Sequence, residues 1–247
     1  MKLNDRLKAI ADEIEKGQTM ADIGTDHGFL PLYLWENDIC PQVIMADISV
    51  GSLNKAKETF SCIGKHDHKQ IAGGNVSFRL GNGLDVINAG EVDVAVIAGM
   101  GGVLMTQIIG SNINKALSLQ KVILQPRNGS GKLRYWLNEA GFEITSESLA
   151  KEGKFICEIL VVRPPGSVKE LPSLENYPDE ISYEIPIRLR SESEELFNIH
   201  IMKKIEVEKK ILKDITDGKG CDLKKKAKTE SRIEFLSGIK RERHYEL

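Results

Sequence analysis

The sequence predicts an α/β fold in which a mostly parallel sheet closes with an antiparallel hairpin and a small helical domain follows. Three observations carry this prediction. Short apolar runs alternate with helical stretches over roughly the first 140 residues. Two strand-like runs then follow one another across a charged turn at 151–154. After Pro164-Pro165-Gly166 the chain becomes acidic and then basic, which indicates a domain boundary.

The elements of the first domain follow one another as repeated βαβ units. Leu3, Leu7, Ile10 and Ile14 share one helical face, so we expect an amphipathic helix at the start. Strands that alternate with helices form a parallel sheet, because the crossovers place helices on both of its faces. The expected strands span residues 19–24, 42–48, 75–80, 92–98 and 121–126, and the expected helices span 28–37, 50–63, 102–116 and 130–140.

The end of the sheet distinguishes it from a dinucleotide-binding fold. The runs 142–150 and 155–163 are joined by a charged turn with a glycine and predict a β-hairpin. A dinucleotide-binding sheet instead repeats its βαβαβ half. Five parallel units closed by an antiparallel hairpin resemble the Rossmann-like sheet of class I methyltransferases, which we assign to residues 1–165.

Residues 166–247 are predicted to form a connector and a coiled-coil-like helical hairpin. The stretch 167–186 is acidic and dotted with prolines, which is typical of an extended connector. The helical stretches 188–216 and 222–243 flank a glycine-bearing turn at 217–220 and predict an αα-hairpin.

Charge divides this second domain. Residues 166–199 carry a net charge of −5, whereas residues 200–247 carry +5. A basic helical pair can contact phosphates, although a solvated helical face explains the same charge. Because the sheet is complete by Arg163, we expect a chain that ends near Gly166 to fold and to bind cofactor but to bind RNA poorly.

The composition restricts the class of protein. A net charge of −2 argues against indiscriminate coating of nucleic acid, and no apolar run reaches membrane-spanning length. The charged N-terminus lacks the apolar stretch of a secretory signal. The four cysteines are scattered and show no zinc-like spacing. We therefore expect a cytoplasmic monomer that holds no metal and does not enter a membrane.

The segment 21-ADIGTDHGFLP-31 is the strongest functional signal, because it lies between the first strand and the first crossover helix. Two carboxylates in this loop suit a ligand that carries amino and sulfonium cations and would repel a diphosphate. A tight turn with capping aspartates is the alternative. The pattern predicts S-adenosylmethionine as cofactor, contacted by Asp22, Gly24, Thr25, His27 and Gly28, with Asp26 beside the reacting methyl.

The next two strands also end in polar residues. Asp47, followed by Ile48, is placed to accept hydrogen bonds from the ribose hydroxyls, or else to cap the helix that begins at Ser49. Asn82 and Gly83 follow the third strand, where the Asn82 amide can pair with the adenine of the cofactor. Asp85 is the alternative reader of that adenine, and a plain glycine turn is a further possibility.

The fourth and fifth strands end in segments suited to the methyl acceptor. The run 98-AGMGG-102 brings Ala98, Gly99 and Met100 to the cofactor, where Met100 can pack against a flat ring. It lacks the Asn/Asp-Pro-Pro-aromatic motif of exocyclic-amine methylases. Gln125 is a catalytic candidate, and Arg127 can hold a phosphate or form a surface salt bridge.

Together, IGTDHGFLP, IAGMGG, ILQPR and the helical pair resemble the bacterial tRNA (adenine-22, N1) methyltransferase family. The resemblance covers residues 3–163 and, beyond them, only the architecture. It implies methyl transfer to N1 of adenine 22 in tRNA, with Asp26, Met100 and Gln125 at the reacting atoms. Adenine N1 carries a lone pair, so no base is required. A methyltransferase for proteins or small molecules, and a non-catalytic binding protein, are the alternatives. The expected RNA contacts are Arg127, Lys203, Lys204, Lys224, Lys225 and Lys226.

Overall fold

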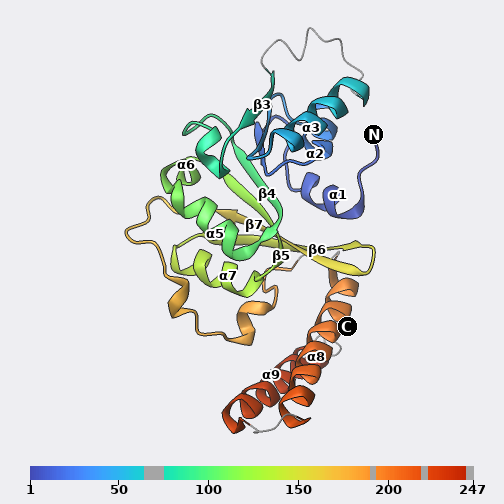
Figure 1. The fold of residues 1–247 in the computed structure, drawn as a ribbon, viewed down its shortest axis with the longest axis vertical. Helices are drawn as coiled ribbons and strands as arrows, with labels where there is room; N and C mark the ends of the chain where they lie inside the picture. The colour runs from blue at the N-terminus through green and yellow to red at the C-terminus, as the bar shows by residue number, and fades with distance from the viewer. Residues whose placement is uncertain (64–74, 190–192, 218–221, 243–247) are drawn as a thin grey trace.

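The computed structural model describes residues 1–63, 75–189, 193–217 and 222–242. Its centre is a seven-stranded sheet of order β3-β2-β1-β4-β5-β7-β6, in which only the β5–β7 and β7–β6 pairs are antiparallel (Figure 1). The strands are β1 (Met20–Ile23), β2 (Val43–Asp47), β3 (Val76–Leu80), β4 (Val94–Gly101), β5 (Lys121–Asn128), β6 (Glu143–Glu152) and β7 (Phe155–Arg163). The predicted parallel sheet with its closing hairpin is confirmed.

Helices cover both faces of the sheet, as the crossovers require. The helices α1 (Asp5–Ala11), α2 (Phe29–Glu36) and α3 (Val50–Ile63) lie on one face (Figure 1). The other face carries α5 (Gly102–Ser111), α6 (Ile113–Leu117) and α7 (Ser130–Glu139). The single helix predicted over 102–116 is therefore two helices, because the chain leaves helical geometry at Asn112.

The strands alternate between two hydrophobic clusters. In β4, Val94 and Val96 pack on the α1–α3 side, whereas Ala95 and Ile97 pack on the α5–α7 side. All four side chains are 0% exposed. Alternate residues of a strand point to opposite faces, so a strand buried on both faces is apolar throughout. This is why the parallel strands are visible in the sequence as continuous apolar runs.

The C-terminal domain consists of a connector and a helix pair that extends from the sheet (Figure 1). The connector contains the short 3-10 helices η3 (Leu174–Asn176) and η4 (Ile181–Glu184), and α8 (Glu194–Asp217) and α9 (Leu223–Glu242) form the pair. The connector is not merely extended, because η4 packs on α7. Of the predicted turn at 217–220, only Asp217 lies within the described residues.

A buried ionic network joins α7 and the sheet to the connector and α8. Arg134 of α7 donates to Glu147 of β6 at 2.8 and 2.7 Å and to Glu158 of β7 at 2.5 Å. The side chains of Arg134 and Glu147 are 3% and 1% exposed. Lys204 of α8 lies 3.9 Å from Glu158, and the ring of His200 lies 3.5 Å from the same carboxylate. Both carboxylates belong to the sheet, but groups from the connector and α8 surround them.

This network changes the expectation for a shortened chain. The backbone amides of Ile187 and Arg188 donate to Glu147 at 2.7 and 3.0 Å. Removal of the chain after Gly166 would leave that carboxylate short of these partners and would expose Leu149, which packs against α8. Arg134 would remain as the counter-charge of Glu147. Because Glu147 would lose two backbone donors and apolar surface would be exposed, we expect such a chain to be less stable, although its sheet is complete.

Candidate active site

Two adjoining cavities follow the carboxyl ends of the parallel strands, where open α/β sheets bind their ligands. The larger cavity has a volume of about 420 Å³ and the smaller about 110 Å³, and both are lined by Gly24 and Met100. The larger is lined by Asn4, Arg6, Leu7, Asp22, Gly24, Thr25, Asp26, His27, Gly28, Phe29, Leu30, Ala98, Gly99, Met100 and Arg127. The smaller is lined by Ile23, Gly24, Ala46, Asp47, Ile48, Gly81, Asn82, Gly83, Met100, Leu104 and Ile108.

The loop between β1 and α2 forms the floor shared by these cavities. Gly24 adopts φ of 82°, and its amide and that of Thr25 donate to the carbonyl of Ala46 at 2.8 and 2.9 Å. Gly28 adopts φ of 66° at the N-cap of α2. A Cβ there would lie 3.1 Å from the Met45 sulfur, so a larger residue would be strained both by its backbone and by its neighbour. The loop is thereby held close to β2.

Asp22, at the end of β1, is a carboxyl group without a close positive partner. Burial raises its pKa to about 6, whereas the neighbouring Thr25 hydroxyl and the charge of Arg6 oppose that rise and the charge of Asp47 adds to it. The hydroxyl of Thr25, which is 1% exposed, lies beside this carboxyl without meeting hydrogen-bond geometry to any described residue. A carboxylate and an orphaned hydroxyl at the cavity wall fit a ligand that brings a cationic hydrogen-bond donor.

The smaller cavity combines polar and apolar groups. Asp47 accepts from the Ser49 amide at 2.6 Å with one carboxylate oxygen and lines the cavity. The cap of α3 is Ser49, whose hydroxyl accepts from the Ser52 amide at 3.3 Å. Asn82 lines it as well, whereas Asp85 is not among the lining residues. Ile48 and Leu104 also line it and are 74% and 47% exposed. Two exposed apolar side chains beside an acid and an amide suit the flat ring and the ribose of a nucleoside.

Met100 separates the two cavities. Its side chain lies over Gly24, so that a Cβ placed on Gly24 would overlap the terminal methyl of Met100. A ligand that spans both cavities must pass this contact. Met100 therefore lies between the two cavities, and its flexible thioether is suited to move aside and then pack against a ligand.

Asp26 lies at the rim of the larger cavity and is charged at neutral pH. Lys55 of α3 donates to Asp26 at 2.9 Å, and this hydrogen bond lowers the pKa of the carboxyl. The carboxylate is 62% exposed and its second oxygen lies 3.5 Å from the ring of His27. Asp26 can thus accept a hydrogen bond from an incoming group, but it does not hold a proton to donate.

Arg127 and Gln125 lie on the same strand but have different surroundings. Arg127 is exposed and lines the larger cavity, with its Nε 3.7 Å from the position of a Cβ on Gly99. Gln125 is 2% exposed, does not line either cavity, and accepts a hydrogen bond from Arg6 at 3.3 Å. The structure therefore does not bring Gln125 to the reacting atoms. Its position favours a role in holding Arg6.

Arg6 and Leu104 are site residues that the sequence analysis missed. Arg6, on α1, donates to Glu152 of the β6–β7 hairpin at 2.9 Å and lines the larger cavity beside Asp22. In the sequence Arg6 is one charge among many on a short helix, and Glu152 lies 146 residues away. Leu104 is an ordinary apolar residue of α5. No local pattern distinguishes either residue from its neighbours, so only tertiary proximity identifies them.

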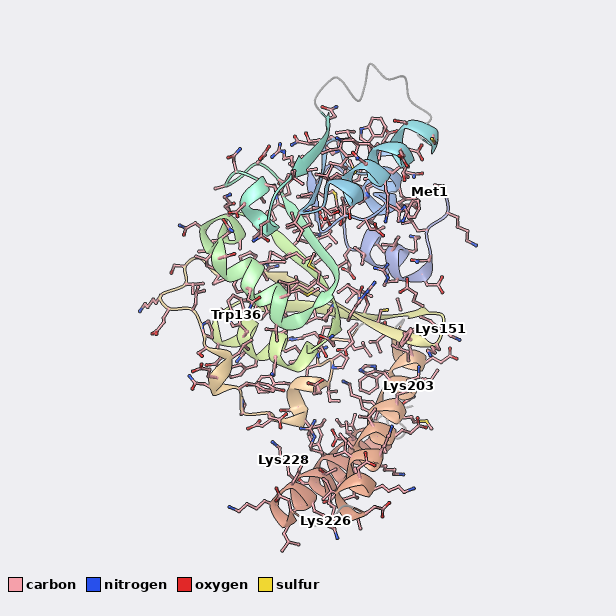
Figure 2. All side chains as sticks on the ribbon, viewed as in Figure 1. Met1, Trp136, Lys151, Lys203, Lys226 and Lys228 are labelled. Atoms are coloured by element: carbon pink, nitrogen blue, oxygen red, sulfur yellow. The ribbon has the colours of Figure 1, made fainter. Side chains whose placement is uncertain are left out.

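The predicted RNA-contacting lysines lie far apart. Lys203 lies at the root of the helix pair, near the β6–β7 hairpin, where it donates to the Lys154 carbonyl at 2.6 Å, whereas Lys226 lies near the far end (Figure 2). Lys204 is 19% exposed and pairs with Glu184 at 3.2 Å, so the structure places it in the interdomain network rather than on the open surface. Lys224 and Lys225 are exposed on α9.

The sheet order and the acidic glycine loop at its carboxyl edge define a class I methyltransferase. The family model described as "Methyltransferase domain" matches residues 3–160. Within the described ranges there is no group of three or more His, Cys, Asp or Glu residues that could hold a metal ion. None of the described helices combines the length and the apolar composition needed to cross a membrane.

Comparison with individual relatives identifies a smaller family within this class. A Bacillus subtilis tRNA (adenine(22)-N(1))-methyltransferase is 35% identical over 161 residues, and the alignment spans 65% of each chain. A Mycoplasma pneumoniae putative tRNA methyltransferase is 32% identical over 64% of this chain and 70% of its own. The solved B. subtilis m1A22 tRNA methyltransferase matches 97% of this chain and 99% of its own, with a TM-score of 0.78 and 26% identity. A Streptococcus pneumoniae putative tRNA (m1A22) methyltransferase, solved with S-adenosyl-L-methionine, covers 97% of this chain and 100% of its own, at 25% identity and a TM-score of 0.73.

The chain therefore belongs to the tRNA (adenine(22)-N(1))-methyltransferase family. The chain's sequence alignment spans 65% of the length of the B. subtilis relative, whereas the structural match covers 97% of this chain and 99% of the solved relative.

Proposed function

We propose that this chain transfers the methyl group of S-adenosylmethionine to N1 of adenine 22 in tRNA. The observation that carries the proposal is the junction of the two cavities at Gly24 and Met100. One cavity suits a nucleoside, and the other suits a cationic amino acid and opens to a second, planar reactant. The names of the B. subtilis and S. pneumoniae relatives supply the substrate.

The residues of both cavities fit this cofactor. Asp22, with the neighbouring Thr25 hydroxyl, would receive the cationic α-amino group, which favours the charged form of the carboxyl. Asp47 keeps a carboxylate oxygen for the ribose hydroxyls. Asn82 would pair with the adenine edge, while Ile48 and Leu104 cover its faces. When bound, the cofactor supplies an electrophilic methyl group whose bonding electron pair stays on sulfur after transfer.

The chain's own residues need only orient the acceptor. Adenine N1 contributes its lone pair to the new bond, so the base becomes cationic and no proton is removed. Asp26, held in its charged form by Lys55, would accept a hydrogen bond from the exocyclic amine of the adenine. This contact grows stronger as positive charge develops on the base, which makes it a transition-state interaction. Arg127 would hold a phosphate at the rim.

The same proposal assigns roles to the two domains. Residues 1–165 would bind the cofactor and perform transfer, while 166–247 would hold tRNA through exposed lysines such as Lys224 and Lys225. We propose that the chain acts as a monomer. Because tRNA is matured in the cytoplasm, we place the reaction there.

The test is mass spectrometry of nucleosides from tRNA incubated with the protein and cofactor. N1-methyladenosine should appear with a tRNA that carries adenine 22 and should be absent when guanine replaces it. Asp26→Ala should lower turnover at least about tenfold while cofactor affinity, measured by calorimetry, changes little. Turnover within about threefold of wild type would mean that less than ~1 kcal/mol of the barrier involves Asp26, which would remove it from the mechanism.

A further inference from the structure

Two aromatic rings stack at the mouth of the larger cavity. The rings of His27 and Phe29 have centroids 5.2 Å apart and planes within 5° of parallel. Both residues line the cavity, and both remain accessible: the His27 side chain is 45% exposed and Phe29 is 37% exposed. The pair therefore presents a flat apolar surface to whatever enters the cavity.

The exposure of Phe29 is not explained by packing. Most residues of α2 that follow it are buried, among them Leu30, Leu32 and Leu34, which are at most 3% exposed. Phe29 begins α2 directly after Gly28, whose left-handed backbone turns the chain into the helix. The backbone that carries the two rings is held in place because Gly28 packs against Met45 of β2 and Ala56 of α3. A fixed backbone suits a binding surface that must keep one orientation.

The groups around this platform match the chemistry of a purine base. Asp26 is adjacent in the chain and offers a carboxylate that accepts hydrogen bonds. Arg127 lines the same cavity from β5 and can bind the phosphate of a nucleotide that enters it. Aromatic side chains bind unpaired bases by stacking on their faces. Adenine N1 lies on the Watson–Crick edge, so the base must leave its helix before it can react.

We propose that His27 and Phe29 form the stacking platform for the target adenine, with Phe29 as the positioning residue that contacts the base. This inference rests on the proposed function and specifies how the acceptor is held. An aromatic face also attracts a cation. As the new bond forms between N1 and the methyl carbon, and the bond between carbon and sulfur breaks, positive charge passes from sulfur to the adenine beside this face. The platform should therefore favour the reacting state as well as the bound base.

The decisive variant is Phe29→Leu, which keeps an apolar side chain but removes the aromatic face. With saturating tRNA and cofactor, its turnover should fall about tenfold, given the usual strength of stacking between a base and an aromatic ring. Phe29→Tyr should stay within about twofold of wild type. Phe235→Leu is a matched control, because Phe235 is 44% exposed on α9 and lies outside both cavities.

A second readout does not depend on turnover. A tRNA with 2-aminopurine in place of the target adenine, bound together with S-adenosylhomocysteine, reports the environment of that base by its fluorescence. Stacking on the platform should keep the fluorescence low in the wild type, in Phe29→Tyr and in Phe235→Leu. In Phe29→Leu the fluorescence should rise, because the base is out of its helix and has lost the aromatic face.

The outcomes separate this inference from the proposed function. If wild-type protein does not methylate tRNA, the proposed function fails. If wild type is active and Phe29→Leu matches it in turnover and in fluorescence, the platform is overturned while the function stands. Loss of affinity for S-adenosylmethionine in Phe29→Leu, by calorimetry, would also overturn it, since the ring would then serve the cofactor. A fall in tRNA affinity alone, with turnover unchanged, would assign the ring to a neighbouring nucleotide.

Discussion

Two buried acidic side chains of the sheet, Asp22 and Glu158, have pKa values that are shifted in opposite directions. Asp22 ends β1 at the cavity floor, and burial raises its pKa to about 6. Glu158, on β7, is also buried, and burial alone would raise its pKa. The charges of Arg134 and Lys204 outweigh that effect and hold the pKa near 2. Asp22 forms no ion pair with any residue that the structure describes, whereas Glu158 is surrounded by charged partners.

This difference distinguishes a binding site from the structural ionic network that joins α8 to the sheet. A protein keeps an uncompensated acid only at some cost in stability, and such groups gather where a ligand completes the interaction. In the network around Glu158, the buried charges of Arg134, Glu147 and Glu158 are paired with groups from other elements, so these charges need no ligand.

Loss of Arg134 should have the largest effect. Arg134→Ala leaves Glu147 and Glu158 buried without their main counter-charge, which should lower the free energy of unfolding by about 3–5 kcal/mol. Thermal denaturation should show a fall in Tm of roughly 10 °C. Arg163→Ala is the control, because Arg163 pairs with Glu143 on the surface, where both side chains are more than half exposed, and should change the stability by less than ~0.5 kcal/mol. Equal effects of the two variants would contradict the contrast.

His200, in the ionic network around Glu158, should make the stability of the folded chain decrease at acidic pH. Burial lowers its pKa to about 4 in the folded chain, below the ordinary value of 6.5. The unfolded chain therefore binds the proton first as the pH falls from 6.5 towards 4, and stability is lost across that window. Asp22 acts in the opposite direction between pH 6 and 3.8, because its raised pKa makes the folded chain bind the proton first.

Urea denaturation at pH 7 and pH 5 measures this effect. His200→Gln should lose about 1–2 kcal/mol less than wild type between the two pH values. The comparison uses the change with pH within each variant, so a general loss of packing in the variant does not affect it. A wild type and a variant with the same pH dependence would show that His200 does not titrate in this window.

At the cavity, Asp22→Asn should separate stability from binding. The amide carries no charge to bury, so the chain without cofactor should gain about 1 kcal/mol at pH 8, or a few degrees in Tm. Affinity for S-adenosylmethionine should fall about tenfold or more, as expected for a lost charged hydrogen bond. The affinity of the wild type should also decrease as the pH falls below about 6, whereas that of the variant should not. A variant that is both less stable and equal in affinity would contradict a ligand-binding role for Asp22.

The smallest effect is expected at the far end of the helix pair. Lys224→Ala with Lys225→Ala should weaken tRNA binding by a few fold and reduce the dependence of affinity on salt by up to about two counterions. The matched pair Lys16→Ala and Lys169→Ala removes two exposed lysines away from α9. Gel-shift titrations at two salt concentrations compare the pairs. The same salt dependence in both would remove the helix pair from RNA binding.

The sequence predicted the site best where binding groups lie directly after strands. Asp22, Gly24, Asp47 and Asn82 each follow or end an apolar run, and all line a cavity. In a parallel sheet the carboxyl ends of strands meet at one edge, so local position alone places such residues together. The choice between Asn82 and Asp85 depended on the turn geometry of η2 (Gly83–Val86), which the sequence left open.

Residues whose role depends on distant neighbours were predicted less well. Gln125 was expected at the reacting atoms, but its side chain points to Arg6, 119 residues away. Lys204 was expected on an open basic face, yet it pairs with Glu184 of the connector. A charge count along a helix does not show which lysines face another domain. The stacking of His27 on Phe29 at the cavity mouth was equally invisible, because a two-residue spacing does not fix ring orientation.

The sequence by itself determined the order of the strands and helices along the chain, the closing hairpin and the position of the acidic loop at the edge of the sheet, because period, turn chemistry and strand ends are local properties. The tertiary structure alone decided how the helix pair is joined to the sheet. Four different elements contribute the charged side chains of this network, which are Arg134, Glu147, Glu158 and Lys204. Their ion pairs connect the elements because folding brings the four side chains together in a buried position. The contribution of a charged side chain to stability depends on the groups that surround it after folding, and no local sequence pattern contains that information.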